Sequence, residues 1–219
     1  MKLNAQQMRT ASESEAAKAT LTSRNPLYLI LENVYDTYNI GGLFRLADGL
    51  NVSKMYLCGQ MEKPPHTRIE KASIGTYKVV PWVYFASVAE ALADIRKVAS
   101  NVSIIAVEQD ERSVPYTRIQ FTKPTALIVG NETYGVLPDT LKLADYIAEI
   151  PMWGINKSLN VIVSAAIVSY EIMRQYSSWR SYIMYLILLE IIFLTFFDID
   201  IYILHMYDIM YECQMNEDK

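Results

Sequence analysis

Residues 27–50 read LYLILENVYDTYNIGGLFRLADGL, and this stretch decides the fold class. It begins with a continuous apolar run, Leu27–Leu31, which is typical of a strand buried on both faces of a parallel sheet. After a polar loop, apolar residues recur at helical spacing from Ile40 to Leu50, and Asn39 stands where an N-cap is expected. A buried strand followed by an amphipathic helix is the repeating unit of α/β proteins.

The same alternation continues along the chain. Short β-prone runs predict strands at 54–58, 79–85, 102–107, 126–129 and 146–150, and Pro81 makes the second an edge or irregular strand. Helical patterns predict helices at 88–99 (with a Ser87/Glu90 capping box), 138–145 and 159–176. We therefore expect an α/β domain over residues 25–180, with a mostly parallel sheet and helices on both faces. Residues 1–24 predict an arm or a weak helix and no secretory signal.

The net charge of −4 argues at first against a nucleic-acid partner, but the charge is unevenly distributed. Residues 1–180 carry 19 Lys and Arg against 17 Asp and Glu, whereas residues 181–219 carry 1 Lys against 7 Asp and Glu. Because the acidity lies in the last 39 residues, the charge balance is neutral evidence on RNA binding.

Residues 181–219 form an atypical apolar and acidic tail without Gly, Ala, Val or Pro. Its run Tyr182–Phe197 is interrupted by Glu190 and followed by Asp198 and Asp200, whereas a membrane span needs about 20 mostly apolar residues. Three origins stay open: a frame-shifted end, a helix that packs or covers a dimer surface, and a membrane anchor, which the acidic residues disfavour.

Polar loops follow three of the predicted strands, at the sheet edge where ligands bind in α/β proteins. In the first loop, Gly41 and Gly42 predict close backbone approach to a ligand or a neighbouring chain. Arg45, one turn further on, favours phosphate binding, and an ion pair with Asp48 is the alternative.

The second loop, Gly130–Gly135, either brings backbone and the Glu132 carboxylate to a ligand or is an ordinary glycine-bracketed turn. The third loop ends at Ser158 and Asn160, which are either site residues or helix caps. The second loop carries neither a P-loop nor a Rossmann fingerprint.

The sequence gives little support for a metal site or for a catalytic nucleophile. His66 and His205 are far apart in the sequence, and no histidine lies in the three loops to activate a serine. The two cysteines, Cys58 and Cys213, make a disulfide scaffold unlikely and fit a reducing compartment, and Cys58 is expected to be a small buried residue.

Taken together, the three loops resemble the SpoU-type (TrmH-like) RNA ribose 2′-O-methyltransferases of the SPOUT superfamily. NVYDTYNIGGLFRLADGL (33–50) resembles the family's N-x-G-x-x-x-R motif, LIVGNETYGV (127–136) its apolar-G-x-E-x-x-G block, and IPMWGINKSLNVIVSAAI (150–167) its I-P-M-x-G-x-x-x-S-L-N-V block. The order and spacing agree, and the resemblance covers residues 25–175. One departure is the Ile-Val-Ser at 162–164, where many members carry Ser-Val-Ala.

The resemblance implies a deep trefoil knot in the C-terminal part of the domain, an exception to the rule against knots. It also implies S-adenosylmethionine as cofactor and a homodimer through the knot region, with active sites at the subunit interface. The cofactor contacts that it implies are Gly130, Ile150, Leu159 and Met152. The catalytic set consists of Arg45 and Asn39, with Glu132, Ser158 and Asn160 ordering the loops. Apart from the resemblance, the candidates for RNA binding are Arg24, Arg68 and Lys71, with His66, Lys78 and the arm residues Lys2, Arg9 and Lys18. The alternative is that each is an ordinary surface charge, and only clustering near Arg45 would favour the RNA role.

These inferences predict a cytoplasmic enzyme that methylates a ribose 2′-hydroxyl in structured RNA, with tRNA favoured over rRNA. Because a guanidinium is a poor proton acceptor, we expect Arg45 to fix the adjacent phosphate and the 2′-oxygen, while the proton leaves through phosphate or water. The alternative is a catalytically inactive knotted RNA-binding protein, against which the intact Asn39, Arg45 and Glu132 speak.

Overall fold

The computed structural model describes residues 4–11, 15 and 23–177 of the chain. The chain divides into two compact units, Met1–Arg174 and Gln175–Lys219, and the sheet belongs to the first. The tail over 181–219 and its apolar run lie outside the described residues, as do Lys2, Lys18, His205 and Cys213. Within the described ranges, no helix is long and apolar enough to cross a membrane.

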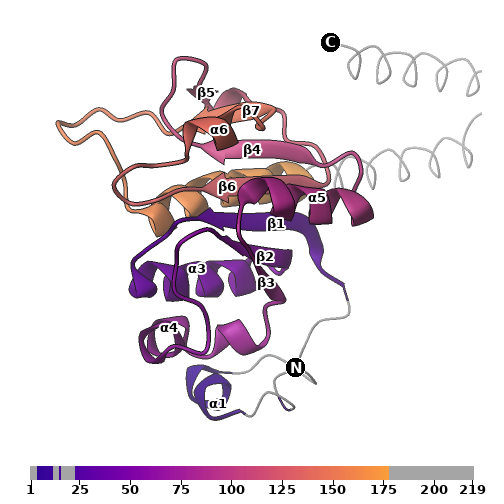
Figure 1. Ribbon diagram of the computed structural model, residues 1–219, viewed down its shortest axis with the longest axis vertical. Coiled ribbons are helices and arrows are strands. Elements are labelled where there is room, and N and C mark those ends of the chain that lie inside the picture. Colours follow the sequence, from indigo (N-terminus) through magenta and orange to yellow (C-terminus); the bar gives the residue numbers. More distant parts are fainter. Residues whose placement is uncertain (1–3, 12–14, 16–22, 178–219) are drawn as a thin grey trace, which may run out of the picture. The chain divides into compact units, whose positions relative to one another are not determined.

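Parallel strands form one sheet in the order β3-β2-β1-β6-β4-β7-β5 (Figure 1). The strands are β1 Asn25–Glu32, β2 Val52–Cys58, β3 Trp82–Phe85, β4 Ser103–Val107, β5 Val114–Pro115, β6 Thr125–Val129 and β7 Tyr146–Glu149. The chain leaves β1 towards β2 on one side and leaves β6 towards β7 on the other. The strand order therefore reverses between β1 and β6, which is where ligands bind in open parallel sheets.

Helices cover both faces of this sheet, as predicted. They are α1 Ala5–Thr10, α3 Thr37–Gly49, α4 Thr67–Ser73, α5 Val88–Val98, α6 Pro138–Leu141 and a helix over 161–177, with 3-10 turns η1 Thr76–Lys78 and η2 Tyr116–Arg118. Alternate strand residues such as Ile30 and Ile128 pack with α5 in one buried cluster. Their neighbours Leu29 and Leu127, equally buried, face the other side, where α3 lies (Figure 1).

Two glycines let α3 fit between its neighbours. A side chain at Gly41 would collide with the backbone of α4, and one at Gly42 would collide with Ile162 of the helix over 161–177. The close approach predicted for this pair is therefore made to helices of the same chain, rather than to a ligand or a neighbouring chain.

Several element boundaries differ from the predicted ones. Helix α3 begins at Thr37 because Asp36, not Asn39, is its N-cap, accepting a hydrogen bond from the Tyr38 N–H at 2.8 Å. The last helix begins after Asn160, whose Oδ1 accepts from the Ile162 N–H at 2.9 Å, so Asn160 rather than Ser158 is the cap. The helix expected over 138–145 ends at Leu141.

Other expectations about the elements are confirmed or extended. The strand after Pro81 is indeed an edge strand, and the arm contains the short helix α1. Helix α4 and strand β5 were not predicted, because each is too short to show a periodic pattern. The trefoil knot stays a prediction.

Candidate functional site

A chain of side-chain hydrogen bonds joins the three predicted loops at the carboxyl edge of the sheet. The Glu132 carboxylate accepts from the Tyr35 N–H at 3.2 Å, the Asp36 N–H at 3.1 Å and Asn39 Nδ2 at 2.9 Å. Asn39 Oδ1 in turn accepts from Asn160 Nδ2 at 3.0 Å. Asn39 is 7% exposed and lies between the other two side chains, so each loop is held by the next.

The same contacts fix the charge of Glu132. Burial alone raises the pKa of this carboxyl, but the hydrogen bonds from Asn39 and from the backbone N–H groups of Tyr35 and Asp36 outweigh burial and lower it. The carboxylate also lies at the N-terminus of α3, where negative charge is favoured. Glu132 is therefore ionised at neutral pH, where it acts as a hydrogen-bond acceptor that holds the loops and is poorly suited to taking up a proton.

Three sets of contacts fix the turn that carries Glu132 and the segment that follows it. The buried carboxylate of Glu32, at the end of β1, accepts from the Leu137 N–H at 2.8 Å and from Thr140 Oγ1 at 2.5 Å. Asn131 Nδ2 donates to the Asn33 carbonyl at 2.7 Å. A side chain at Gly130 would collide with the backbone on the far side of the turn. The turn geometry therefore requires a glycine at position 130, as expected for an ordinary glycine-bracketed turn.

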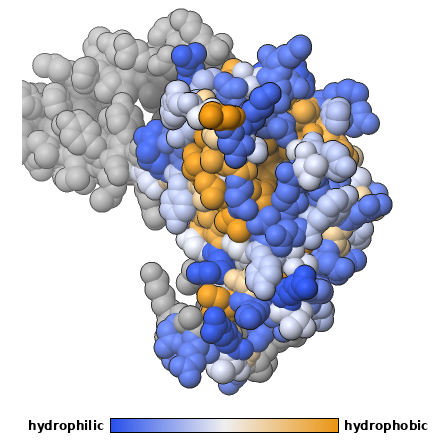
Figure 2. Space-filling model, turned by 90° about the vertical axis from the view of Figure 1, so that its left-hand side faces the viewer, coloured by the Kyte–Doolittle hydropathy of each residue, from blue (hydrophilic) through white to orange (hydrophobic). Residues whose placement is uncertain are grey.

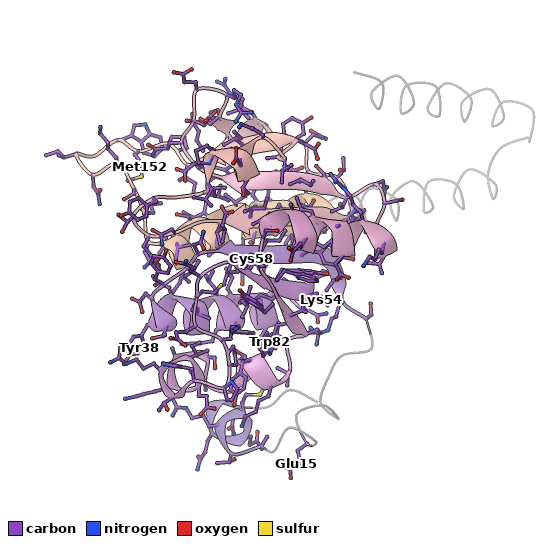
Figure 3. The ribbon with its side chains drawn as sticks, viewed as in Figure 1. Glu15, Tyr38, Lys54, Cys58, Trp82 and Met152 are labelled. Carbon is purple, nitrogen blue, oxygen red and sulfur yellow. The ribbon has the colours of Figure 1, made fainter. Side chains whose placement is uncertain are left out.

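A cavity of about 520 Å³ opens beside this turn, between the loops that follow β4, β6 and β7. Its volume lies in the usual range for small-molecule sites. All four residues predicted to contact the cofactor line it, namely Gly130, Ile150, Met152 and Leu159. Glu132, Ser158 and Asn160 of the predicted catalytic set line it as well. Figure 3 shows Met152 on the same side of the molecule as Tyr38 at the start of α3.

Two polar residues of the cavity wall were missed in the sequence. Glu108 and Gln109 directly follow β4. Glu108 Oε2 accepts from the Val136 N–H at 2.8 Å, and Gln109 Nε2 donates to the Lys157 carbonyl at 2.6 Å. The sequence could have identified them, because ligands bind at the carboxyl ends of parallel strands, and this holds for β4 as it does for the three strands considered.

Arg45 lies away from the cavity wall, on α3. It is exposed, and among the described residues it has no hydrogen-bond or ion-pair partner. The alternative of an Arg45–Asp48 pair is wrong, because the electrostatic partner of Asp48 is Arg24. Arg45 follows Asn39 by six residues on the same helix, a rise of about 9 Å.

The residues predicted to bind RNA fall into two groups. Arg24 is partly buried: its guanidinium donates to the Val79 carbonyl at 2.7 Å and to the Val52 carbonyl at 3.2 Å, and burial lowers its pKa. Lys78 donates to the Ala11 carbonyl at 2.8 Å, beyond the end of α1. His66 caps α4. Arg9, Arg68 and Lys71 are exposed, the last two on α4, which packs on α3.

Comparison with known proteins now decides the family. The model of the SpoU rRNA Methylase family matches residues 26–170. This chain is a member of that family. It is 32% identical over 171 residues to the tRNA (guanosine(18)-2′-O)-methyltransferase of Thermus thermophilus, covering 76% of this chain and 84% of the relative. It is 30% identical to the 23S rRNA (guanosine-2′-O-)-methyltransferase of Ralstonia nicotianae, covering 69% and 60%.

Solved SpoU structures share the fold. The TrmH/SpoU tRNA modifying enzyme of A. aeolicus superimposes with a TM-score of 0.66 at 28% identity, covering 78% of this chain and 85% of that one. The methyltransferase AviRb of Streptomyces viridochromogenes, in complex with the cofactor AdoMet, gives 0.64 at 27% identity, covering 74% and 62%. The predicted family and enzyme class, an RNA methyltransferase that uses S-adenosylmethionine, are confirmed. The roles of individual residues stay predictions.

Proposed function

We propose that this SpoU protein transfers a methyl group from S-adenosylmethionine to a ribose 2′-hydroxyl of structured RNA, and that tRNA is the preferred substrate. The observation that carries the proposal is the Asn160–Asn39–Glu132 chain beside the cavity, because it joins the three loops that the reaction needs. The relatives named as tRNA enzymes favour tRNA, although relatives named as 23S rRNA enzymes also match.

The cavity fits the cofactor in size and in chemistry. Ile150, Met152 and Leu159 give it apolar walls for a purine ring, and Gly130 leaves backbone groups accessible for polar contacts. When bound, the cofactor supplies an electrophilic methyl group.

Arg45 binds the phosphate next to the target ribose and orients the 2′-oxygen. Its planar guanidinium suits a phosphate, and no described residue competes for it. Asn39 and Glu132 fix the start of the same helix, and Asn160 and Ser158 order the loop that faces it. Since neither Arg45 nor Glu132 is suited to accept a proton, the hydroxyl proton leaves to the neighbouring phosphate or to water.

We further propose a cytoplasmic homodimer, formed through a knotted C-terminal region. On the loop over 151–160, Trp153 is 93% exposed and Ile155 is fully exposed, and Val163 and Tyr170 are exposed on the next helix. Figure 2, a view from the side of this loop, shows hydrophobic residues gathered in the middle of that face. A second subunit there would bring its own Arg45 towards the cavity, which is why Arg45 lies outside the cavity wall of its own chain. Light scattering of the full chain tests this, since a monomer would contradict it.

The activity is tested by incubating the full chain with S-adenosylmethionine and total RNA from a strain lacking its gene, followed by mapping of ribose methylation. We expect one new 2′-O-methyl position, in tRNA. Calorimetry with S-adenosylmethionine separates the alternative, because an inactive RNA-binding protein that has lost the cofactor would fold and give no heat. Methylation of a base instead of a ribose would contradict the proposal.

A further inference from the structure

Two tyrosines flank the N-cap of α3, and the hydrogen-bond chain uses neither side chain. Tyr35 and Tyr38 are each 51% exposed. Their backbones are fixed, since the Tyr35 N–H donates to Glu132 and the Tyr38 N–H donates to Asp36. An exposed ring on a fixed backbone loses little conformational freedom when a ligand packs against it.

Tyr38 shares a face of α3 with Arg45. The two residues are seven apart, which places them on the same side of a helix about 10 Å from each other along its axis. Between them, Gly42 packs against Ile162 of the helix over 161–177. A polymer that is bound at Arg45 and runs along α3 towards the N-terminus of the helix therefore passes close to Tyr38.

The chemistry of this pair matches an unpaired nucleotide. An exposed aromatic ring stacks on any nucleobase, whereas a guanidinium binds the phosphate. The spacing of about 10 Å corresponds to one or two nucleotides of an extended strand. In a continuous duplex the bases are stacked on each other and are not available to a side chain.

We propose that Tyr38, with Tyr35 beside it, is a stacking platform for an unpaired base that lies one or two nucleotides from the target ribose. The inference rests on the proposed function, and it adds a substrate class: the ribose lies in a loop or a splayed segment of RNA. Tyr35 and Tyr38 are then specificity-determining residues of the RNA site, and neither touches the cofactor cavity wall.

The test uses the full chain and a short single-stranded RNA that carries the fluorescent base 2-aminopurine, whose emission is quenched by stacking. We expect the wild-type protein and Tyr38→Phe to quench the probe. Tyr38→Leu, which keeps an apolar side chain but has no ring, binds the probe and total tRNA about 5-fold to 100-fold more weakly. Tyr35→Leu has a smaller effect in the same direction.

Tyr146→Leu is the matched control. Tyr146 is also half-exposed, but it begins β7 at the opposite edge of the sheet, so this variant should bind and quench like wild type. Binding of S-adenosylmethionine should be the same in every variant, which separates this inference from the proposed function: if the wild-type protein binds no cofactor and methylates no RNA, the proposed function fails instead.

Three results would overturn the platform. Tyr38→Leu quenches and binds like wild type; Tyr38→Phe loses as much as Tyr38→Leu, so that the hydroxyl and not the ring matters; or Tyr38→Leu dissociates a dimer, so that a second copy of the chain covers the tyrosines.

Discussion

Arg24 and Arg45 are the same residue type in two regions with opposite organisation. Arg24 precedes β1 at the amino edge of the sheet, where it donates to the backbone carbonyl of Val52 at the start of β2 and to that of Val79, which precedes β3. Arg45 lies on the outer face of α3, and the described part of the chain offers it no partner. One side chain completes the fold, whereas the other is left available to a ligand.

The polar groups around these two arginines differ in the same way. At the amino edge, Asn25 donates to the Leu50 carbonyl, and Asp145 accepts from the Ile104 N–H, so side chains satisfy backbone groups. At the carboxyl edge, Glu132, Asn39 and Asn160 bind one another across a long sequence separation and leave a cavity beside them. What distinguishes the carboxyl edge is that polar side chains there also bind one another beside a cavity, as Asn39 does with Glu132 and Asn160.

The sharpest test of this contrast is Arg45→Ala. We expect methyl transfer to fall by about 100-fold, because a charged group that positions the reacting atoms is lost, while the melting temperature stays within experimental error. Arg45→Lys should recover only a small part of the activity, since a lysine cannot bind phosphate in the bidentate manner. Near-normal turnover of Arg45→Lys would contradict phosphate positioning by a planar guanidinium.

Breaking the Asn160–Asn39–Glu132 hydrogen-bond chain should have the next largest effect on methyl transfer. Glu132→Gln keeps one acceptor oxygen but turns an NH₂ group towards donors, so we expect about a 10-fold loss of turnover. Asn160→Ala should behave similarly, with some loss of stability because its helix cap is removed as well. Steady-state kinetics with saturating cofactor measures both, and unchanged turnover in both variants would show that the chain of contacts is not needed.

Arg24→Ala should show the reverse behaviour. Two backbone carbonyls lose a charged donor, so we expect the free energy of unfolding to fall by about 1–3 kcal/mol. Activity per folded molecule should be unchanged. Urea unfolding at constant m-value measures the first quantity. Normal stability combined with weakened RNA binding would show that Arg24 binds RNA, and that it does not differ from Arg45 in the way described.

The smallest expected effect is on acid stability. The pKa of Glu132 is lower in the folded protein than in the unfolded chain, so its stabilising contribution is complete above the unfolded value of roughly 4.3 and is lost as the pH falls through the folded value. The stability difference between wild type and Glu132→Gln should therefore shrink between about pH 5 and pH 3. A difference that is constant with pH would show that the charge of Glu132 does not matter.

Much of this molecule could be predicted from its sequence, and the failures have common physical causes. The parallel sheet followed from apolar runs, and the cavity wall at Gly130, Ile150 and Leu159 followed from the motif resemblance. The caps were misplaced because Asp36 and Asn160 compete with equally suitable neighbours in the sequence. Arg24 and Lys78 looked like surface charges because the carbonyls that bind them come from distant or irregular segments.

The hydrogen bonds at Glu132 also determine when the site can form during synthesis of the chain. Asn39 and Glu132 are 93 residues apart, and Asn39 and Asn160 are 121 apart, so the site needs residues from both ends of the domain. During translation, an emerging polypeptide holds Asn39 early but has no complete site until the segment with Asn160 has left the ribosome. The contacts that join the three loops therefore form only late in synthesis, and a chain interrupted before Asn160 cannot form them.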